Sequence, residues 1–325
     1  MFHAPPTCDS DCPAPAGFRS DLPRWRQLVA VNWLAALLAH QSVAAAPVAG
    51  WSLFEVACDG LDAFVGGHIP GAHYLDTRQF EQLPFWNVVP RDALQAVLQH
   101  AGIRADGTVV LYGRNTLAVA RVAHCLLTAG VQDVRLLDGG LDAWSAAGQP
   151  LHHGLPPQRQ PRAAEFVTAP RVGYLPRPDY LIDTAQAKVL LAQPDAALVS
   201  IRTRAEFLGE TSGYSYIAAR GEIPDARWGH AGSDGDVNSM GSFQNEDGRM
   251  KPAADIVALW RDAGIRPEMQ IAFYCGTGWR ASLAFFYAWL MGWERISVYD
   301  GGWFEWSSDP ANPVMCLTPV SGGPI

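Results

Sequence analysis

Charged residues are scarce in this sequence, and the positive ones do not cluster. Asp, Glu, Lys and Arg together make up 17% of the 325 residues, and the formal net charge is −8. A protein that binds a nucleic-acid backbone needs a basic patch to neutralise phosphates, and no such patch is visible in the sequence. We therefore expect no nucleic-acid partner.

Cysteines are also few and widely spaced. Six of them are distributed over a long chain, which is unlike the dense spacing of a disulfide framework. Cys8 and Cys12 lie close together, but no later cluster of Cys and His residues completes a metal site. We interpret them as part of a loose tail, and a reducing cytosol fits this cysteine usage best.

The sequence has no hydrophobic run of membrane-spanning length. The apolar run over residues 28–38 is interrupted by Asn32 and falls short of the roughly 20 residues that a span needs. The first fifteen residues contain no lysine or arginine, so they lack the basic start of a secretory signal peptide. We expect no membrane partner and a cytoplasmic location.

What the sequence does contain is an alternation of strand-like and helix-like runs, repeated twice. The length allows two domains of about 150 residues each. Parallel sheets with helices on both faces follow from such alternation, so we predict the α/β class in both domains. The predicted division is a disordered tail at 1–20, a first domain at 21–148, a linker at 149–178, a second domain at 179–310 and a tail at 311–325.

Several features recur at one constant spacing along the chain, which indicates a duplication. The matched features are Tyr112 and Tyr274, Gly130 and Gly292, Asp138-Gly139-Gly140 and Asp300-Gly301-Gly302, and Trp144 and Trp306. The same spacing places Gly113 opposite Cys275 and Ala118 opposite Arg280, so the first copy lacks both a thiol and a cation. We predict one active site, in the second domain. Because the Asp-Gly-Gly turn occurs in both copies, we interpret its aspartates as structural.

The stretch from Cys275 to Arg280 carries the chemistry. A short run of strand formers precedes it, and an apolar run suited to a buried helix follows it. Backbone N–H groups at such a turn converge on the sulfur, and Arg280 adds a positive charge; both favour a thiolate. We predict that Cys275 is a nucleophile outside the hydrophobic core. The predicted loop residues are Gly276, Thr277, Gly278, Trp279 and Arg280.

Taken together, these motifs resemble the tandem-domain rhodanese family of sulfurtransferases. The carrying segments are Gly67–Ala72, Glu222–Ala226, the Cys275 loop and the two Asp-Gly-Gly turns. The resemblance implies that Cys275 takes a sulfane sulfur from a small-molecule donor such as thiosulfate or polysulfide. It holds the sulfur as a persulfide and passes it to an acceptor such as cyanide or a thiol, with ping-pong kinetics. No metal or organic cofactor is implied, and the first domain is expected to be silent.

Loop length separates this chemistry from that of the related cysteine phosphatases. Four residues lie between Cys275 and Arg280, whereas a phosphate-binding loop of that kind has five. Tyr274 also stands where the phosphatases have a histidine. The smaller ring of N–H donors suits one sulfur atom, so we favour sulfur over phosphate.

One segment departs from the family pattern. Family members that use thiosulfate or 3-mercaptopyruvate well have arginines before the Ile-Pro turn that hold the anion. In this sequence Glu206 stands where such an arginine is expected. Arg202 and Arg204 either compensate for it or form pairs on the surface. The identity of the donor is therefore left open.

The same segment is similar to rhodanese-type enzymes that insert sulfur into a histidine betaine to make ergothioneine. Tyr216 and Thr277 match the tyrosine and threonine that lie near the imidazole in those enzymes. A pocket formed by Glu206, Tyr214, Tyr216 and Trp279 would suit a quaternary ammonium group. A non-enzymatic alternative is a carrier whose persulfide passes only to a partner protein. The sequence leaves the oligomeric state open.

Overall fold

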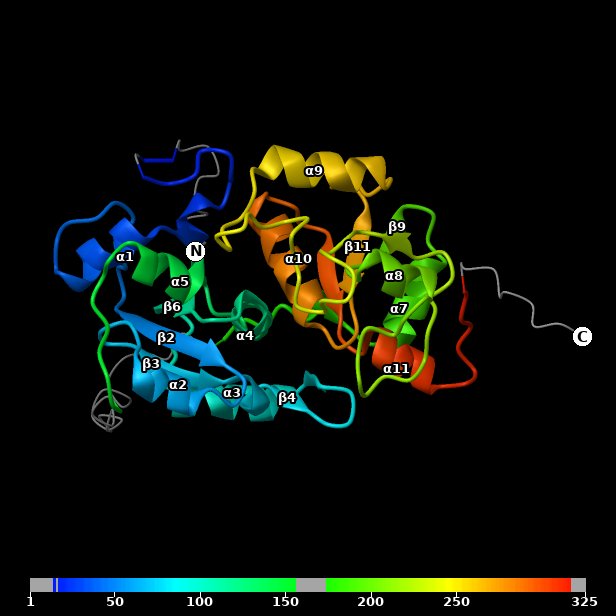
Figure 1. Ribbon diagram of the computed structural model, residues 1–325, viewed down its shortest axis with the longest axis horizontal. Helices are drawn as coiled ribbons and strands as arrows, with labels where there is room; N and C mark the ends of the chain where they lie inside the picture. The colour runs from blue at the N-terminus through cyan, green and yellow to red at the C-terminus, as the bar shows by residue number, and fades with distance from the viewer. Residues whose placement is uncertain (1–13, 16, 156–173, 317–325) are drawn as a thin grey trace, which may run out of the picture.

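The fold consists of two α/β halves that lie side by side. The computed structural model describes residues 14–15, 17–155 and 174–316 of the chain. Each half contains one five-stranded sheet in which every strand pair is parallel. In Figure 1 the first half is on the left, in blue to green, and the second half is on the right. The predicted α/β class with two parallel sheets is confirmed.

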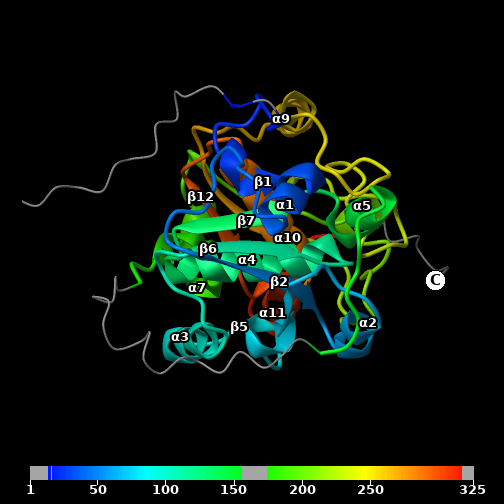
Figure 2. The ribbon, with the colours of Figure 1, turned by 90° about the vertical axis from the view of Figure 1, so that its left-hand side faces the viewer.

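The first half has the strand order β1-β7-β6-β2-β3, and Figure 2 looks toward this sheet. Its strands are β1 (Leu28–Val29), β2 (Trp51–Ala57), β3 (His73–Asp76), β6 (Thr108–Tyr112) and β7 (Asp133–Leu137). Its helices are α1 (Val31–Leu38), α2 (Leu61–Gly66), α3 (Arg91–His100), α4 (Thr116–Ala129) and α5 (Gly140–Ala146). A separate antiparallel hairpin is formed by β4 (Glu81–Gln82) and β5 (Asn87–Val88).

The second half repeats this plan with the strand order β10-β9-β11-β12-β8. Its strands are β8 (Leu181–Ile182), β9 (Ala196–Ser200), β10 (Arg227–Trp228), β11 (Gln270–Tyr274) and β12 (Ile296–Tyr299). Its helices are α7 (Thr184–Leu191), α8 (Arg204–Leu208), α9 (Ala253–Asp262), α10 (Trp279–Leu290) and α11 (Gly302–Ser308). Among the residues that the structure describes, no helix has the length and apolar character needed to cross a membrane.

Helices cover both faces of each sheet because successive strand residues point to opposite sides. In β2, Leu53 packs in a cluster with residues of α1, α2 and α5. The next residue, Phe54, packs in a second cluster with residues of α3 and α4. That second cluster continues into α9 and α10 of the second half. One hydrophobic core therefore runs through both halves and joins them.

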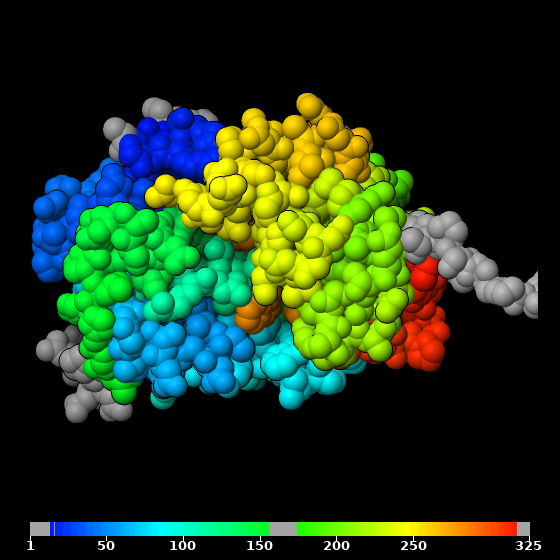
Figure 3. All heavy atoms as spheres, in the orientation of Figure 1, coloured from blue at the N-terminus to red at the C-terminus, as the bar shows by residue number. Residues whose placement is uncertain are grey.

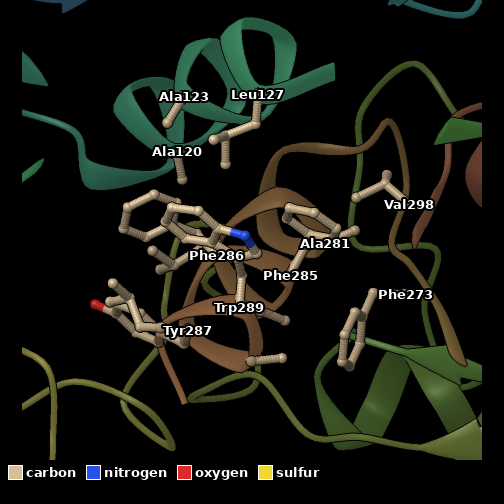
Figure 4. Close-up of a cluster of buried hydrophobic side chains, with 14 of the residues drawn as sticks. Ala120, Ala123, Leu127, Phe273, Ala281, Phe285, Phe286, Tyr287, Trp289 and Val298 are labelled. Atoms are coloured by element: carbon tan, nitrogen blue, oxygen red, sulfur yellow. The ribbon is translucent and has the colours of Figure 1, made fainter. Parts of the chain in front are cut away.

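Helices α4 and α10 form the centre of this shared core. Both are apolar around most of their circumference, which is the pattern of a helix buried on all sides. Figure 4 shows Ala120 and Ala123 of α4 directed toward the aromatic side chains of α10. Small residues on one helix leave room for large rings on the other, among them Phe285 and Phe286. The helix that begins at the Cys275 loop is thus held by the first half.

Two hydrogen bonds from backbone N–H groups to aspartate side chains join the halves in matching fashion. The N–H of Met250 donates to Asp138 Oδ1 at 2.9 Å, and the N–H of Val88 donates to Asp300 Oδ2 at 2.8 Å. In each contact the aspartate begins the Asp-Gly-Gly turn of one half, and the amide belongs to the other half. Both the aspartates and the amides are related by the spacing of the duplication. Because each half gives the other the same contact, the halves are related by an approximate two-fold axis. The structural role predicted for both aspartates is confirmed.

Asp138 makes folding sensitive to pH, because burial raises its pKa to about 6 from the ordinary 3.8. Between about pH 4 and 6 the folded state keeps a proton that the unfolded state has lost, so stability should fall as the pH rises. Asp138→Asn keeps an acceptor for the Met250 amide and removes this loss. As the pH rises from 4 to 7.5, the free energy of unfolding of the variant should increase by about 2–3 kcal/mol relative to that of wild type. Urea unfolding at both pH values tests this, and an equal pH dependence in the two proteins would contradict it.

The expected tails and linker belong to the fold where they are described. Phe18 packs edge-on against Trp25 with ring centroids 4.7 Å apart, so the expected disordered tail is wrong for residues 17–20. His152 of the expected linker makes a backbone bridge to the first half, and Met315 of the expected C-terminal tail makes one to the second half. The rest of these predictions, residues 1–13 (with Cys8 and Cys12), 156–173 and 317–325, lies outside the described residues.

Candidate active site

Cys275 lies where β11 ends and just before α10 begins at Trp279. This is the strand, turn and helix order that the sequence predicts. Gly278 takes a positive φ of 99° at the N-cap of α10, and its N–H donates to Cys275 Sγ at 3.2 Å. A helix N-terminus with a backbone donor on sulfur stabilises an anion at that atom. The loop therefore suits a thiolate or a persulfide sulfur.

Cys275 is nevertheless buried, with a relative exposure of 1%, and it contributes to the shared core. The prediction that it lies outside the core is wrong. The reason is that side chains distant in sequence cover the loop. A Cβ atom on Gly276 would lie 2.3 Å from the ring of Tyr214, so this ring rests directly on the loop backbone. Gly276 must therefore be a glycine in this arrangement.

The loop is also held from the side of α11. The N–H of Trp303 donates to the carbonyl oxygen of Cys275 at 2.8 Å. Gly302 has a φ of +54°, and a Cβ atom there would lie 2.7 Å from the same oxygen. The second glycine of the Asp-Gly-Gly turn is required by this close approach. Its counterpart Gly140 makes the same approach to the oxygen of Gly113 in the first half.

Arg280 and Glu206 form a buried, bidentate ion pair. Nη1 and Nη2 of Arg280 donate to the two carboxylate oxygens of Glu206, each at 2.8 Å. Nη2 also donates to the hydroxyl of Tyr214 at 2.7 Å. Both ionic side chains are 1% exposed, so the positive charge predicted for the loop is compensated. The pocket for a quaternary ammonium group stays a prediction, and in this structure the Glu206 carboxylate that it would use is paired with Arg280.

The position of Glu206 is fixed by its own helix. Thr203 caps α8, and the Glu206 carboxylate accepts the Thr203 N–H at 2.8 Å in a capping box. Burial acts to raise the pKa of Glu206. The hydrogen bond from Arg280 and its positive charge together lower the pKa by more than burial raises it, so the net shift is downward. The carboxylate is therefore ionised and stays paired with Arg280 at neutral pH.

Arg202 and Arg204 lie in different environments. Arg202 is fully buried and donates to the carbonyl of Gly221 at 2.8 Å and to Glu222 at 3.4 Å, so the surface pair considered for it is wrong. Arg204 is exposed and stacks on the ring of Trp228 with 4.7 Å to the centroid. A donor-binding role for either arginine stays a prediction, and Arg202 would have to leave its buried partners.

Tyr216 and Thr277 are brought together, as the matching of the two positions predicts. Burial raises the pKa of Tyr216, and the neighbouring Thr277 side chain acts in the opposite direction. Tyr216 is 51% exposed, in contrast to the covered loop. It therefore lies between the loop and solvent.

Trp279 contacts the first half through a residue that sequence reasoning missed. Its indole N–H donates to both carboxylate oxygens of Glu81, at 2.9 and 3.1 Å. Glu81 lies in the β4–β5 hairpin, in a stretch that forms no recognisable motif. Figure 3 shows atoms in orange, the colour of β11 and α10 in Figure 1, at the bottom of a hollow between the two halves. The site thus lies where the halves meet.

No metal site is evident in the part of the chain that the structure describes, since no three His, Cys, Asp or Glu side chains come together there. The site instead offers one thiol, a helix N-terminus and hydroxyl groups.

A search against known families identifies this arrangement. Residues 46–147 and 183–309 each match the rhodanese-like domain. The chain belongs to the rhodanese-like family. The predicted membership of a tandem-domain rhodanese-like protein is confirmed, and both rhodanese-like domains coincide with the two halves described above.

Named relatives extend the comparison across this rhodanese-like chain. The thiosulfate sulfurtransferase YnjE of Escherichia coli K12 is 51% identical over 293 residues, which is 90% of this chain and 66% of that protein. This chain therefore spans about two thirds of the length of YnjE. The crystal structure of YnjE matches with a TM-score of 0.84 over 90% of this chain and 69% of that chain.

Two further relatives carry different names. A probable 3-mercaptopyruvate sulfurtransferase of Pseudomonas aeruginosa is 34% identical over 268 residues, covering 78% of this chain and 86% of that protein. The anaerobic ergothioneine biosynthesis enzyme of Chlorobium limicola, in complex with trimethyl histidine, is 37% identical. Its structure matches with a TM-score of 0.84 over 92% of this chain and 72% of that chain. The rhodanese-like family thus includes relatives named for different substrates.

Proposed function

We propose that this chain is a sulfurtransferase that moves a sulfane sulfur from thiosulfate or polysulfide to cyanide or a thiol through a persulfide on Cys275. The observation that carries the proposal is the position of the Cys275 sulfur. It lies at the N-terminus of α10 and accepts the N–H of Gly278 at 3.2 Å. The rhodanese-like family and the 51% identity to a thiosulfate sulfurtransferase support it.

The reaction proceeds in two balanced steps. The Cys275 thiolate attacks the outer sulfur of thiosulfate; a new sulfur–sulfur bond forms, and sulfite leaves with the electrons of the old one. Cyanide carbon then attacks the outer sulfur of the persulfide, which releases thiocyanate and restores the thiolate. The N–H of Gly278 and the helix N-terminus stabilise the negative charge on sulfur in the thiolate form. Two steps through a covalent form give ping-pong kinetics.

Cys275→Ser should abolish this reaction. Intact-mass measurement after incubation with thiosulfate should show one added sulfur, about 32 Da, on wild type and none on the variant. Cys58→Ser is the matched control, because Cys58 is an exposed free thiol in the first half, and this variant should still gain one sulfur. A serine variant at 275 that gains the same mass would show that another residue carries the sulfur.

A second candidate activity is polysulfide-dependent sulfur insertion into a histidine betaine. The contact between Tyr216 and Thr277 and the similarity to the Chlorobium limicola enzyme favour it. The ion pair between Glu206 and Arg280 weighs against it, because the expected carboxylate is not free for a cation. A panel of thiosulfate, 3-mercaptopyruvate and polysulfide as donors, with cyanide, thiols and histidine betaine as acceptors, separates the two activities. Sulfur release limited to one equivalent would instead indicate a carrier for a partner protein.

A further inference from the structure

A buried polar network joins the silent first half to the Cys275 loop. Its first member is Glu81, whose carboxylate accepts the indole N–H of Trp279 at 2.9 Å. The same oxygen accepts Nε–H of Arg121, from α4, at 2.8 Å. Glu81 and Arg121 are 6% and 0% exposed. Two buried polar side chains of the first half are therefore placed against the first residue of α10.

Arg121 extends the network to the other side of the loop. Its Nη2 donates to Asp300 Oδ1 at 2.8 Å. Asp300 begins the turn that leads to Gly302 and Trp303, the two residues that press on and hydrogen-bond to the carbonyl of Cys275. Displacement of Asp300 would shift this turn and, with it, the end of the strand that carries the sulfur.

A third contact comes from the remaining nitrogen of the same guanidinium. Arg121 Nη1 is buried and has no hydrogen-bond partner among the described residues. A Cβ atom on Gly278 would lie 2.8 Å from it, so this nitrogen lies directly against the loop backbone. The guanidinium therefore contacts the residue whose N–H donates to the Cys275 sulfur.

The duplication shows what this position looks like where no catalysis is expected. In the first half, the residue before Glu81 accepts a backbone N–H bond from Val89; in the second half, the residue before Gln244 accepts one from Lys251. Val89 and Lys251 are matched by the spacing of the duplication, so Gln244 is the structural counterpart of Glu81. The hairpin that faces the silent loop thus carries a neutral amide in place of the carboxylate.

Arg121 and Trp279 of the network also have counterparts without polar groups. At the spacing of the duplication, Leu283 is the counterpart of Arg121, and Leu117 is the counterpart of Trp279. Apolar residues and one amide therefore replace Glu81, Arg121 and Trp279 on that side, whereas Asp138 remains as the counterpart of Asp300. Buried ion pairs often stabilise a fold no better than apolar residues of similar volume. Since the charged version lies on the side of Cys275, it points to a role in the loop itself.

We propose that Glu81 and Arg121 of the silent domain are positioning residues for the Cys275–Arg280 loop. They hold Trp279 and Asp300, and through them they set where the Cys275 sulfur lies relative to the N–H of Gly278. This inference rests on the proposed sulfur transfer. Because both residues are buried and act through Trp279 and Asp300, their loss should lower kcat and leave KM nearly unchanged. A shift of about 1 Å in a reacting group lowers rates by about 100-fold, so we expect a loss of about 10- to 100-fold.

The test replaces Glu81 and Arg121 by the residue types that occupy the equivalent positions on the silent side. Glu81→Gln/Arg121→Leu reproduces the pair that the structure already accommodates at Gln244 and Leu283, so the variant should fold. Its kcat for thiosulfate and cyanide should fall about 10- to 100-fold, with KM changed less than about threefold. Gln244→Leu is the matched control on the silent side and should keep wild-type kcat. Unchanged kcat in the double variant, or an equal loss in Gln244→Leu, would overturn the proposal.

Two further measurements keep the inference separate from the proposed function. Glu81→Ala and Trp279→Phe remove the two ends of one hydrogen bond, so their effects on kcat should not add in the double variant; additive effects would overturn the role of that bond. Alkylation of Cys275 by iodoacetamide reports loop position without sulfur transfer, and we expect it to be several-fold faster in Glu81→Gln/Arg121→Leu. Absence of a persulfide in wild type would refute the function, whereas unchanged alkylation would refute the positioning role.

Discussion

Glu206→Gln should destabilise the protein by about 3–5 kcal/mol at neutral pH, because it leaves the Arg280 guanidinium buried without a counter-charge. Arg280 is 1% exposed and donates two of its bonds to Glu206. The pKa of Glu206 is lowered in the folded protein, so its contribution is complete above the ordinary value of 4.5 and is lost as the pH falls below it. Urea unfolding of wild type and variant at pH 7 and pH 3.5 should show a difference that shrinks in acid.

The control for this prediction removes both charges. Glu206→Gln/Arg280→Met leaves no buried ion without a partner, so it should be more stable than Glu206→Gln alone. Glu210→Gln, at an exposed position four residues further on, should change stability by less than about 0.5 kcal/mol. If the double variant is the least stable of the three, the ion pair does not account for the loss.

Much of the fold and the strand–turn–helix setting of Cys275 could be predicted from the sequence because they depend on local patterns. Strand formers before Cys275 and an apolar run after it define β11 and α10, and glycines mark the turn between them. The constant spacing between matched features identified the duplication because no gap interrupts it. The same comparison places Gly113, which has no thiol, opposite Cys275.

Contacts between distant segments could not be predicted in the same way. Glu206 and Arg280 are 74 residues apart, and no sequence pattern indicates that they form one ion pair. The sequence showed each as a charge near the site, whereas the structure shows two charges that compensate each other. Burial of Cys275 follows from the same cause, since Tyr214 and Gly302 reach the loop from elsewhere in the chain.

Duplication also makes the effect of a single methyl group testable in one chain. Gly302→Ala should destabilise the protein by about 2–5 kcal/mol, because φ is +54° and the new Cβ would lie 2.7 Å from the carbonyl oxygen of Cys275. Gly140→Ala should destabilise it by a similar amount, because φ is +58° and the Cβ would lie 2.5 Å from the oxygen of Gly113. Denaturant unfolding measures both losses.

The two variants should differ in activity although they match in stability. Relief of the contact at Gly302 moves the backbone of Cys275, and we expect kcat per folded molecule to fall about 100-fold. Relief of the contact at Gly140 moves a loop that carries no thiol, so kcat per folded molecule should stay within about twofold of wild type. This difference is tested by measuring sulfur transfer under conditions in which denaturant unfolding shows that both variants are folded. Equal kcat in the two variants would mean that the Asp-Gly-Gly turn holds the halves together without setting the geometry of Cys275.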